Sequence, residues 1–311
     1  MSTPLRVGII GLGARCTIAK NCQDSTVPAE LVGGCDPNPA MRERAREILG
    51  DHPWVESLEE LLRLGIDAAI VTSPDDTHED ITCQLLEAGV GVYLEKPIAI
   101  TIEGADRVLE TAYRTRTALY VGHNMRHMAV VRILRQVIRD GLIGEVRAIW
   151  CRHFVGNGGD YYFKDWHAER SRTTGLLLQK AAHDIDVMNW LSDSVPERVV
   201  GMGDLMVYGK LTDRSGQRSD RVMSDWFSYE NWPPESLTGL NPVIDVEDLS
   251  MFMMRQVSGT MISYEQCHFT PDYWRNYTVI GTRGRAENFG DGDGGVVRVW
   301  KHRSRWEPQG D

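Results

Sequence analysis

Short apolar runs alternate with amphipathic segments along the first third of the chain. The runs have the length of buried strands, and the segments between them repeat apolar residues with the period of a helix. This alternation is typical of a parallel sheet with crossover helices, and because such crossovers are right-handed the sheet is expected to be doubly wound. Strands are predicted at residues 5–10, 30–35, 68–72, 91–94 and 118–121, and helices at 41–49, 58–64, 78–88 and 102–116.

The pattern changes after Gly122, where we place a boundary between domains 1–122 and 123–311. Beyond it, several strand-like runs follow one another, which indicates an α+β domain with a mostly antiparallel sheet. The polar stretch 204–240 is expected to be a long loop or insertion. Helices are predicted at 130–139 and 178–191, a glycine-rich loop at 156–159, and strands at 146–154, 249–254, 260–265 and 277–280.

The composition fits a two-domain enzyme and excludes several other classes of protein. The chain of 311 residues is longer than one core usually supports, and 42% hydrophobic with 25% charged residues is ordinary for a soluble globular enzyme. No apolar run is long enough to span a bilayer, and the amino terminus lacks the segments of a secretory signal, so a cytoplasmic location without a membrane role is expected. A net charge of −10 argues against a nucleic-acid partner. The six cysteines form no C-x-x-C pair, so reduced thiols are expected rather than disulfides or a zinc knuckle.

Two glycines follow the first predicted strand, in the run Gly11-Leu12-Gly13-Ala14-Arg15. One permits a tight turn, and the other lets the backbone approach a pyrophosphate at the start of the next helix, where free N–H groups and the helix dipole favour an anion. Cys16 stands at the third position of this fingerprint, where a glycine would let the helix pack closely on the strand. A small shift of that helix is therefore expected.

Asp36 ends the second predicted strand. A carboxylate there can accept hydrogen bonds from both hydroxyls of an adenosine ribose, and it would repel a 2′-phosphate. The alternative is a turn-forming aspartate before Pro37. The order of strand, glycines, helix and acid favours a dinucleotide-binding Rossmann domain, with NAD preferred over NADP because Arg42 is the only nearby cation that could hold the extra phosphate.

Lys96 lies in the run Glu95-Lys96-Pro97, directly after the predicted strand 91–94. At the carboxyl edge of a parallel sheet it would meet a nucleotide held by the first turn, which makes it a candidate acid or base. The alternative is a solvated lysine in an ordinary strand-to-helix turn.

The predicted helix around His183 carries a polar stripe. His183 titrates near neutrality, so it can pass protons to and from a hydroxyl, and Asp186 could orient it or bind a substrate hydroxyl. The alternatives are a hydrogen-bonded interface histidine and a metal ligand; no metal site is predicted, because spacing does not locate further ligands. The stripe consists of Gln179, His183, Asp186 and Trp190, while Leu178, Ile185, Met188 and Leu191 are expected to pack on the sheet, with Lys180 and Asp184 in intermediate directions.

In their order along the chain, these motifs resemble the Gfo/Idh/MocA oxidoreductases over nearly the whole length. The resemblance rests on the glycine fingerprint, Asp36, the run 72–78, Glu95-Lys96-Pro97, the run 122–126 and the His183 helix. It implies a Rossmann domain followed by a domain whose large open sheet often forms the oligomer interface, so a homo-oligomer, either a dimer or a tetramer, is expected. It also implies hydride transfer between a nicotinamide and a carbohydrate or polyol carbon, with Lys96 and His183 at the reacting hydroxyl and a Lys96-Pro97 bond that is commonly cis.

The resemblance also implies the remaining site residues. Residues expected to bind the cofactor are Gly11, Leu12, Gly13, Ala14, Arg15, Asp36, Thr72, Ser73, Pro74, His78, Glu95, Lys96 and Asn124. Residues expected to bind the substrate are Lys96, Arg126, Trp166, His167, Gln179, Lys180, His183 and Asp186. Simpler roles remain open: His78 could cap its helix, Asn124 and Arg126 could be turn and surface residues, and Tyr161, Tyr162 and Trp166 could lie in the core instead of stacking on a sugar.

The chain departs from the family pattern at several positions. Many members carry an aspartate four residues before the helix histidine, where this chain has Gln179 followed by Lys180. A glutamine cannot accept a proton, so the expected acid/base pair is reduced to Lys96 with His183. Trp166-His167 stands where Trp-Arg is common, and many members continue past the position of the last residue into another helix.

The expected mechanism is oxidation of an alcohol by NAD. Lys96 would deprotonate a hydroxyl of a sugar-like substrate once burial and the cationic nicotinamide have lowered its pKa, and His183 would hold or relay the proton. Two alternatives stay open. A tightly held NAD could serve a transient oxidation that gives net hydrolysis, elimination or epimerisation, or the protein could be a non-catalytic nucleotide-binding regulator.

Overall fold

Parallel strands build the amino-terminal sheet. The structure is a computed structural model in which residues 3–22, 26–216, 220–303 and 310 are described. In that part of the chain the first sheet has the order β3-β2-β1-β4-β5-β6, with parallel neighbours throughout. The order reverses between β1 and β4, so the predicted doubly wound sheet is confirmed. Its strands are β1 (Leu5–Ile10), β2 (Ala29–Cys35), β3 (Trp54–Val55), β4 (Ala68–Val71), β5 (Gly91–Leu94) and β6 (Leu119–Val121).

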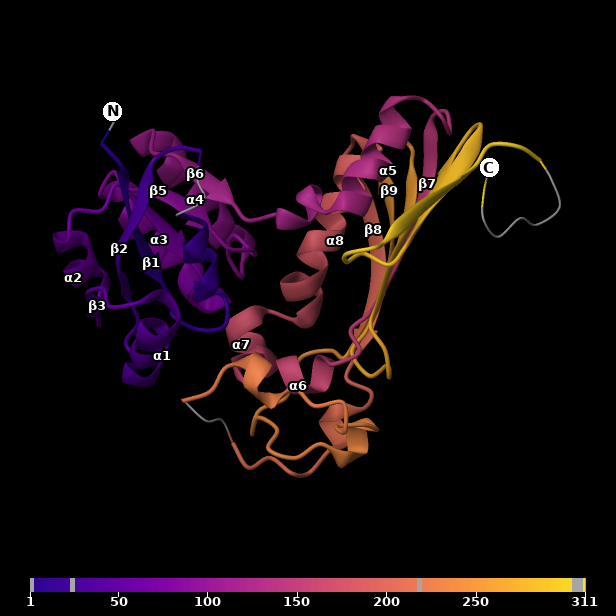
Figure 1. Cartoon of the computed structure of the whole chain (residues 1–311). Helices are drawn as coiled ribbons and strands as arrows, with labels where there is room; N and C mark the ends of the chain where they lie inside the picture. The colour runs from indigo at the N-terminus through magenta and orange to yellow at the C-terminus, as the bar shows by residue number, and fades with distance from the viewer. Residues whose placement is uncertain (1–2, 23–25, 217–219, 304–309, 311) are drawn as a thin grey trace.

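Helices cross between these strands and cover the sheet (Figure 1). Their starts follow from local chemistry. The Asn38 side chain accepts a hydrogen bond from Ala40 N at 3.0 Å, and Ser57 and Glu60 form a reciprocal capping box. The helices are α1 (Pro39–Leu49), α2 (Leu58–Arg63), α3 (His78–Glu87) and α4 (Ile102–Thr115).

The connection from β1 to β2 differs from the expected helix. Cys16–Cys22 forms a 3₁₀ helix instead of an α-helix, and the two-residue strand β3 was not predicted. Cys16 is fully buried in a cluster with Ile9, Leu12 and Met41, so its side chain takes up the space that a closely packed α-helix would use. The β-branched Thr17 and Ile18 also disfavour an α-helix here.

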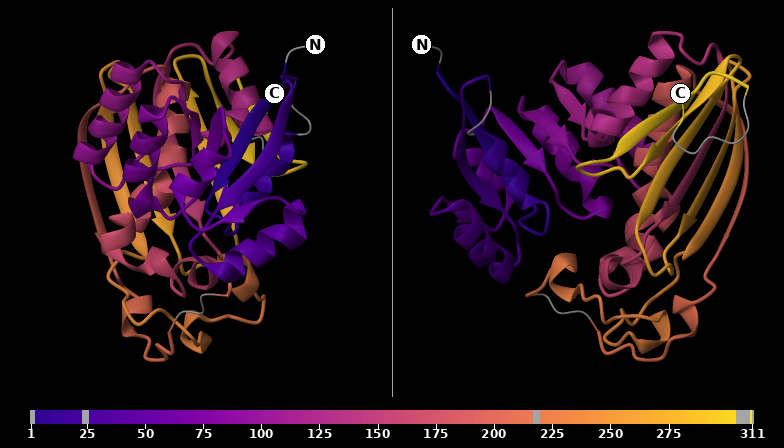
Figure 2. Two further views of the ribbon diagram at one scale, coloured as in Figure 1. Left: turned by 90° about the vertical axis from the view of Figure 1, so that its left-hand side faces the viewer. Right: turned by 45° about the vertical axis from the view of Figure 1, so that its right-hand side comes forward.

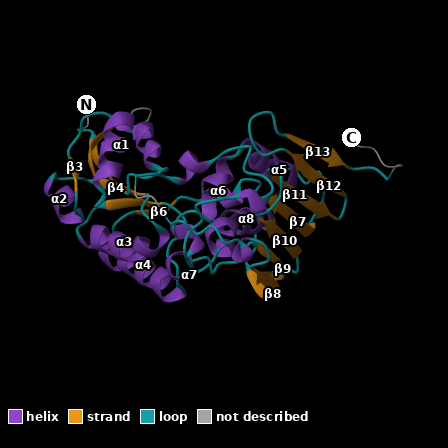
Figure 3. Ribbon diagram, turned by 90° about the horizontal axis from the view of Figure 1, so that it is seen from below, coloured by secondary structure: helices purple, strands orange, loops and turns teal. Residues whose placement is uncertain are grey.

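The second sheet is large and mostly antiparallel, as expected. Within the described residues its order is β13-β12-β11-β7-β10-β9-β8, which Figure 3 shows as one continuous row. In this row β7 and β10 run parallel, and the other neighbours run antiparallel. The strands are β7 (Val146–Phe154), β8 (Pro196–Asp204), β9 (Leu249–Gln256), β10 (Met261–Cys267), β11 (Trp274–Gly281), β12 (Gly284–Phe289) and β13 (Val296–Trp300).

Two long helices cover one face of this sheet and leave the other open. α5 (Ala129–Arg139) and α8 (Leu176–Ser192) lie on the face that is turned toward the first domain (Figures 1 and 2). Apolar side chains of both helices and of the strands enclose the main core of this domain there. No helix of the described residues covers the opposite face, where Trp150, Met251 and Met253 are exposed.

Residues 205–248 form the long segment between β8 and β9, and it reaches the first domain (Figure 1). The expected loop or insertion is thereby confirmed, but it is well packed. Tyr208, Leu237 and Leu240 share an apolar cluster with residues that flank α6 (Gly158–Tyr162). Val222 joins the cluster around Leu12 in the first domain. The regular structure of this segment consists of 3₁₀ helices at Tyr208–Lys210, Met223–Trp226 and Pro234–Ser236.

None of the described helices has both the length and the apolar character that crossing a membrane requires.

Candidate active site

The carboxyl ends of β1, β4 and β5 meet where the strand order reverses, and they bring predicted site residues together. Gly11 has a φ of +86°, and a Cβ added there would lie 2.4 Å from Ser73 N. Only glycine therefore allows these two turns to approach so closely. The Thr72 hydroxyl donates to the Gly11 carbonyl at 2.7 Å, and Glu95 N donates to Val71 O at 3.0 Å. The glycine turn, the run 72–78 and the Lys96 turn are thus side by side.

The second glycine of the first turn is open to its surroundings. A Cβ at Gly13 would lie 3.8 Å from Val222, an ordinary contact distance. Leu12 is fully buried, so its side chain is not available to a ligand. Arg15 reaches the next turn of the sheet, with 2.6 Å between its Nη2 and Glu95 Oε1.

Asp36 is fixed at the end of β2 by main-chain hydrogen bonds. Its Oδ2 accepts from Leu12 N at 2.9 Å and its Oδ1 from Asn38 N at 2.8 Å. Both oxygens keep further lone pairs that can accept from ribose hydroxyls. The Arg42 guanidinium donates to Asp36 O and to Glu56, each at 2.8 Å. That cation is therefore engaged within its own domain.

Lys96 follows β5, and its bond to Pro97 is cis, as the resemblance implies. Its Nζ donates to the main-chain oxygen of Gln179 in α8 at 2.6 Å, so the side chain extends from the first sheet to the helix that carries His183. Burial lowers the pKa of Lys96, although the charge of Asp75 opposes that effect. A lysine with a lowered pKa can act as a base near neutral pH.

His183 lies one turn after Gln179, and the structure changes its expected protonation. Burial, together with Lys96 and Lys180, lowers the pKa of His183 to about 2. The expectation that it titrates near neutrality is wrong, because a partly buried imidazole near two lysines keeps its neutral form. Its Nδ1 and the Oε1 of Gln179 are buried without a hydrogen-bond partner in the described part of the chain. Polar atoms left unpaired beside Lys96 suit a ligand that supplies the missing hydrogen bonds.

Asp184 anchors α8 to the sheet and does not point in the intermediate direction expected for it. It is fully buried and accepts hydrogen bonds from Tyr264 Oη at 2.9 Å and Tyr277 Oη at 2.5 Å. Arg275 Nε and His153 Nδ1 each lie 3.1 Å from its carboxylate. Burial raises the pKa of Asp184, but Arg275 and His153 outweigh that effect and hold the pKa below its usual range. The carboxylate stays charged and fixes the rotation of α8.

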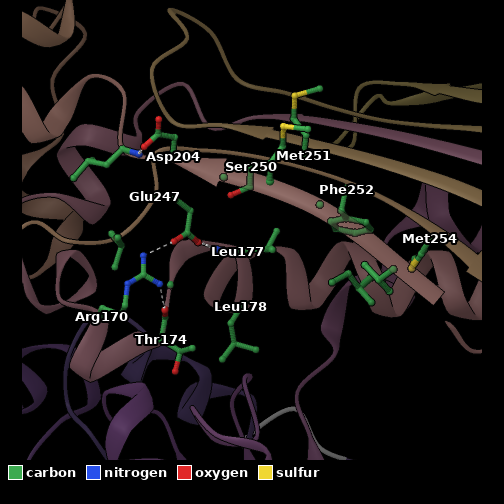
Figure 4. Close-up of a pocket in the computed structure, with 18 of the residues that line it drawn as sticks. Arg170, Thr174, Leu177, Leu178, Asp204, Glu247, Ser250, Met251, Phe252 and Met254 are labelled. Atoms are coloured by element: carbon green, nitrogen blue, oxygen red, sulfur yellow. Dashed lines mark hydrogen bonds and ion pairs between the residues drawn. The ribbon is translucent and has the colours of Figure 1, made fainter. Parts of the chain in front are cut away.

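Ile185 packs against the core on the sheet, as expected. Leu178 was expected to do the same, but it lines a cavity of about 890 Å³ between α8, β8 and β9, which Ile185 also borders (Figure 4). Its described lining includes none of the predicted site residues. At the polar end, Glu247 accepts from Leu177 N at 2.7 Å and pairs with Arg170 at 3.0 Å. A negative charge at the first turn stabilises a helix, so this end of the cavity secures the start of α8. Arg170 belongs to the short helix α7 (Arg170–Thr173).

The run 72–78 borders the site from the side of β4. His78 is buried, with its Nδ1 2.6 Å from Pro97 O and its Nε2 3.0 Å from Ser73 O. The ring joins two turns and forms no side-chain cap on α3. Asp75 is 4% exposed, and its Oδ2 has no hydrogen-bond partner among the described residues. Burial raises the pKa of Asp75, while the charge of Lys96 opposes that effect. Sequence reasoning missed Asp75, because spacing does not say which of the two aspartates in this run is buried.

A cluster of aromatic rings lies beside Lys180. Tyr162 is buried, and its ring lies edge-on to His167 with 5.3 Å between the centroids. His167 stacks on Trp166, with 3.6 Å between the centroids, and its Nδ1 lies 2.5 Å from Asp165 Oδ1. Lys180 Nζ lies 5.6 Å from the centre of the Tyr162 ring, and burial lowers the pKa of Lys180 to about 8.

Two residues expected to bind substrate are paired with each other. Arg126 donates to Asp186 from Nε at 2.7 Å and from Nη2 at 2.5 Å. This bidentate pair joins the connection after β6 to α8. Asn124 is exposed at the start of the 3₁₀ helix Asn124–His127.

The turns at the switch point fit a dinucleotide of the NAD(P) type. Gly11 makes the tight turn, the partly exposed Gly13 leaves room for a ligand to approach the main chain, and Asp36 presents a carboxylate at the end of β2. Among the described residues no cluster of three or more His, Cys, Asp or Glu side chains is arranged to hold a metal ion. The six cysteines are free thiols.

Comparison with protein-family models gives two matches that together span most of the chain. Residues 5–123 match the model of an oxidoreductase family with an NAD-binding Rossmann fold. Residues 131–287 match the model of the GFO/IDH/MocA C-terminal domain.

Comparison with curated proteins and solved structures also finds oxidoreductases. YteT of Bacillus subtilis, named as an oxidoreductase, is 28% identical over 268 residues, which cover 75% of this chain and 63% of YteT. Inositol 2-dehydrogenase of Azotobacter vinelandii is 28% identical over 197 residues, which cover 61% of this chain and 54% of that enzyme. The chain thus spans less than two thirds of the length of these relatives. The WlbA dehydrogenase of Bordetella pertussis, solved with NADH and UDP-GlcNAcA, shares the fold with a TM-score of 0.77 at 21% identity, over 96% of this chain and 77% of WlbA.

Proposed function

Because the chain belongs to the Gfo/Idh/MocA family of oxidoreductases, we propose that it transfers a hydride between a nicotinamide cofactor and a hydroxyl-bearing carbon of a sugar, polyol or sugar acid. The observation that carries this proposal is the position of Lys96. It is a partly buried lysine with a lowered pKa, it follows β5 at the same edge of the sheet as the glycine turn, and its Nζ contacts the helix of His183. This is where a base must stand to act on a substrate that lies between cofactor and helix.

NAD is the proposed cofactor, and its nicotinamide would supply the hydride acceptor. Gly11 and Gly13 would let the pyrophosphate approach the main chain, and Asp36 would bind the ribose hydroxyls. Asp36 would also repel a 2′-phosphate, and Arg42 is already engaged by Asp36 O and Glu56. Both features support NAD over NADP.

Lys96 would take the proton of the reacting hydroxyl in its neutral amine form. His183 is neutral, so its role would be to donate or accept a hydrogen bond at the same hydroxyl and orient it, rather than to carry the proton. Lys180 and His167 lie near Tyr162 and would bind other oxygens of the substrate. We further propose that the boundary between the domains lies near Gly122, and that the first domain binds the cofactor while the second binds most of the substrate.

The first test is a titration of the purified protein with NADH and with NADPH, followed by energy transfer from its nine tryptophans to the nicotinamide. NADH should bind at least several-fold more tightly. Tighter NADPH binding would contradict the cofactor preference, and no binding of either would contradict the dehydrogenase proposal.

The second test is oxidation of a panel of sugars, inositols and sugar acids by the wild type and by Lys96→Ala. The variant should lose at least about a hundredfold in kcat, the usual contribution of a positioned base, while its NADH affinity stays within a few-fold. Lys210→Ala, at an exposed lysine of the segment 205–248, is the control that should match the wild type. Turnover without accumulation of NADH would instead indicate a transient oxidation.

A further inference from the structure

The carboxylates of the candidate site differ in whether an arginine forms an ion pair with them. Glu95 pairs with Arg15 at 2.6 Å, and Asp186 pairs with Arg126 at 2.5 Å. Asp76, next to Asp75 in the chain, lies 3.4 Å from the guanidinium of Arg172. Each of these negative charges is therefore already compensated by an arginine.

Asp75 is buried and lacks such a partner in the described residues. It is 4% exposed, and its Oδ2 accepts no hydrogen bond there. A buried carboxylate without a cation is costly, so a structure keeps one where a charge nearby compensates it. The basic groups whose charge acts on Asp75 are Lys96, His78 and His167, with Lys96 contributing most.

The backbone holds Asp75 in a fixed relation to Lys96. The His78 ring bridges Ser73 O and Pro97 O at 3.0 and 2.6 Å. These carbonyls lie two residues before Asp75 and one residue after Lys96, so the ring clamps both turns together. The turns that carry Asp75 and Lys96 are thereby joined through a buried histidine rather than through a mobile loop.

We propose that Asp75 is a positioning residue for Lys96: its carboxylate balances the ammonium form of Lys96 inside the closed site and so sets the pH range in which Lys96 can act as a base. The inference rests on the proposed role of Lys96. Other groups face Lys96 as well, and their effects differ. Glu95 is compensated by Arg15, and Lys180 repels the ammonium. The partly buried His183 and His123 have lowered pKa values and stay neutral. Tyr162 is buried with a raised pKa, so it also stays uncharged.

The test is competitive labelling of Lys96 with acetic anhydride over a series of pH values, with the extent of labelling read by mass spectrometry. In Asp75→Asn the pH of half-maximal labelling should fall by at least about one unit, the lower end of the effect of an opposite charge close by. Asp75→Ser, which also removes the charge but needs less room, should give the same shift. Asp76→Asn is the matched control and should leave the pH of half-maximal labelling unchanged.

A rescue separates charge from packing. The Gln179 main-chain oxygen lies 2.6 Å from Lys96 Nζ, and its side-chain Oε1 is buried without a partner in the described structure. A carboxylate at this position, Gln179→Asp, added to Asp75→Asn should move the pH of half-maximal labelling back up. The acidic limb of the pH profile of kcat/KM should shift to lower pH in Asp75→Asn and back to higher pH in the double variant.

Labelling needs neither substrate nor turnover, so it tests the role of Asp75 independently of the proposed dehydrogenase activity. A shift in Asp75→Asn without any dehydrogenase activity would support the counter-ion role and refute the proposed function. Dehydrogenase activity with no shift, or an equal shift in Asp76→Asn, would overturn the inference.

Discussion

A single buried carboxylate holds α8, and with it His183, to the second sheet. Asp184 is fully buried, with Tyr264, Tyr277, Arg275 and His153 as partners. Replacing it by alanine removes one of the two carboxylates that pair with the buried Arg275, the other being Asp291 at 2.9 Å. Removing one partner of a buried ion pair typically costs about 3–5 kcal/mol of folding free energy. We expect Asp184→Ala to lower the free energy of unfolding by this amount in urea denaturation, although alanine favours the helix.

Asp193 provides the matched control at the end of the same helix. It is exposed and lies 3.3 Å from Arg135; a surface pair of this kind contributes about 0–1 kcal/mol. If Asp184→Ala and Asp193→Ala unfold at the same urea concentration, the buried network does not secure α8.

We expect His153 to make the folded protein sensitive to mild acid. Arg275 can only donate, and its Nη2 lies 3.0 Å from His153 Nε2, so that nitrogen must be unprotonated. Burial, with Arg275, lowers the pKa of His153 to about 4. An unfolded histidine titrates near pH 6.5, so between pH 6.5 and pH 4 the unfolded chain binds a proton that the folded chain excludes. The contribution of His153 to the free energy of unfolding is therefore fully present above pH 6.5. Below pH 6.5 it decreases by up to about 1.4 kcal/mol per pH unit.

The measurement is the free energy of unfolding between pH 7.5 and pH 5. It should fall with decreasing pH, and the slope should be smaller in His153→Gln, whose side chain does not titrate. His52→Gln, at a residue of the partly exposed aromatic pair with Trp54, is a control that should keep the wild-type slope. An unchanged slope in His153→Gln would show that His153 does not carry the acid sensitivity.

Sequence reasoning found the residues whose chemistry depends on local motifs and missed those defined by distant partners. Lys96 follows a recognisable strand, and the family resemblance assigns it a role. Asp184 meets His153, Tyr264 and Tyr277, which are 31, 80 and 93 positions away along the chain. Helical periodicity predicts the direction of a side chain, but it does not reveal which polar groups of the sheet that side chain will meet.

At the scale of elements, strands buried on both faces were predictable and strands with weak patterns were not. The runs of β1, β4 and β5 are short and apolar between turn residues, as in parallel sheets. β8 reads Pro-Glu-Arg-Val-Val-Gly-Met-Gly-Asp, with two glycines and no alternation, and it is exposed along its whole length. Its strand conformation depends on pairing with β9, which no local pattern reveals.

Gly11 lies at the end of β1, in the turn that we expect to bind the cofactor. A Cβ there would lie 2.4 Å from Ser73 N, and the φ of +86° disfavours any other residue. Gly11→Ala must push the β1 and β4 turns apart, so we expect NADH binding to become undetectable in the tryptophan titration together with a lower melting temperature.

Gly65 is the control for backbone strain alone. It has a φ of +72°, and a Cβ there would meet no atom within 4 Å. Gly65→Ala should therefore lose about 1 kcal/mol of stability and keep its NADH affinity. NADH binding by Gly11→Ala at wild-type strength would contradict the assignment of this turn to the cofactor.

At the scale of the whole molecule, contacts from several elements join the two domains around the site. Lys96 Nζ binds Gln179 O at 2.6 Å, and Arg44 of α1 pairs with Asp225 of the segment 205–248 at 3.0 Å. Val222 of the same segment packs beside Leu12. The sequence predicted two domains, but not that the polar segment would return to the first one. Its few apolar residues become informative only when the surface that receives them is known.

The open face of the second sheet gives the last prediction. Val200, Met253 and Trp150 lie in one row, because Val200 pairs with Met253 and Ser263 pairs with both Met253 and Trp150. Their exposed fractions are 62%, 57% and 54%, with Ser263 between Met253 and Trp150. Exposed apolar side chains gathered in this way mark an interaction surface. A second copy of the chain can cover this face with its own, since a two-fold interface uses the same patch twice.

We therefore expect the wild type to be a homo-oligomer in solution and Trp150→Glu with Met253→Glu to be a monomer, because the two new charges on each copy would be buried together in the interface. Multi-angle light scattering at micromolar concentration gives the mass directly. Tyr113→Glu, on the exposed side of α4 with 88% of the tyrosine accessible, should keep the wild-type mass. An oligomer that survives the double substitution would place the interface elsewhere, and a monomeric wild type would mean that the sheet face serves another contact.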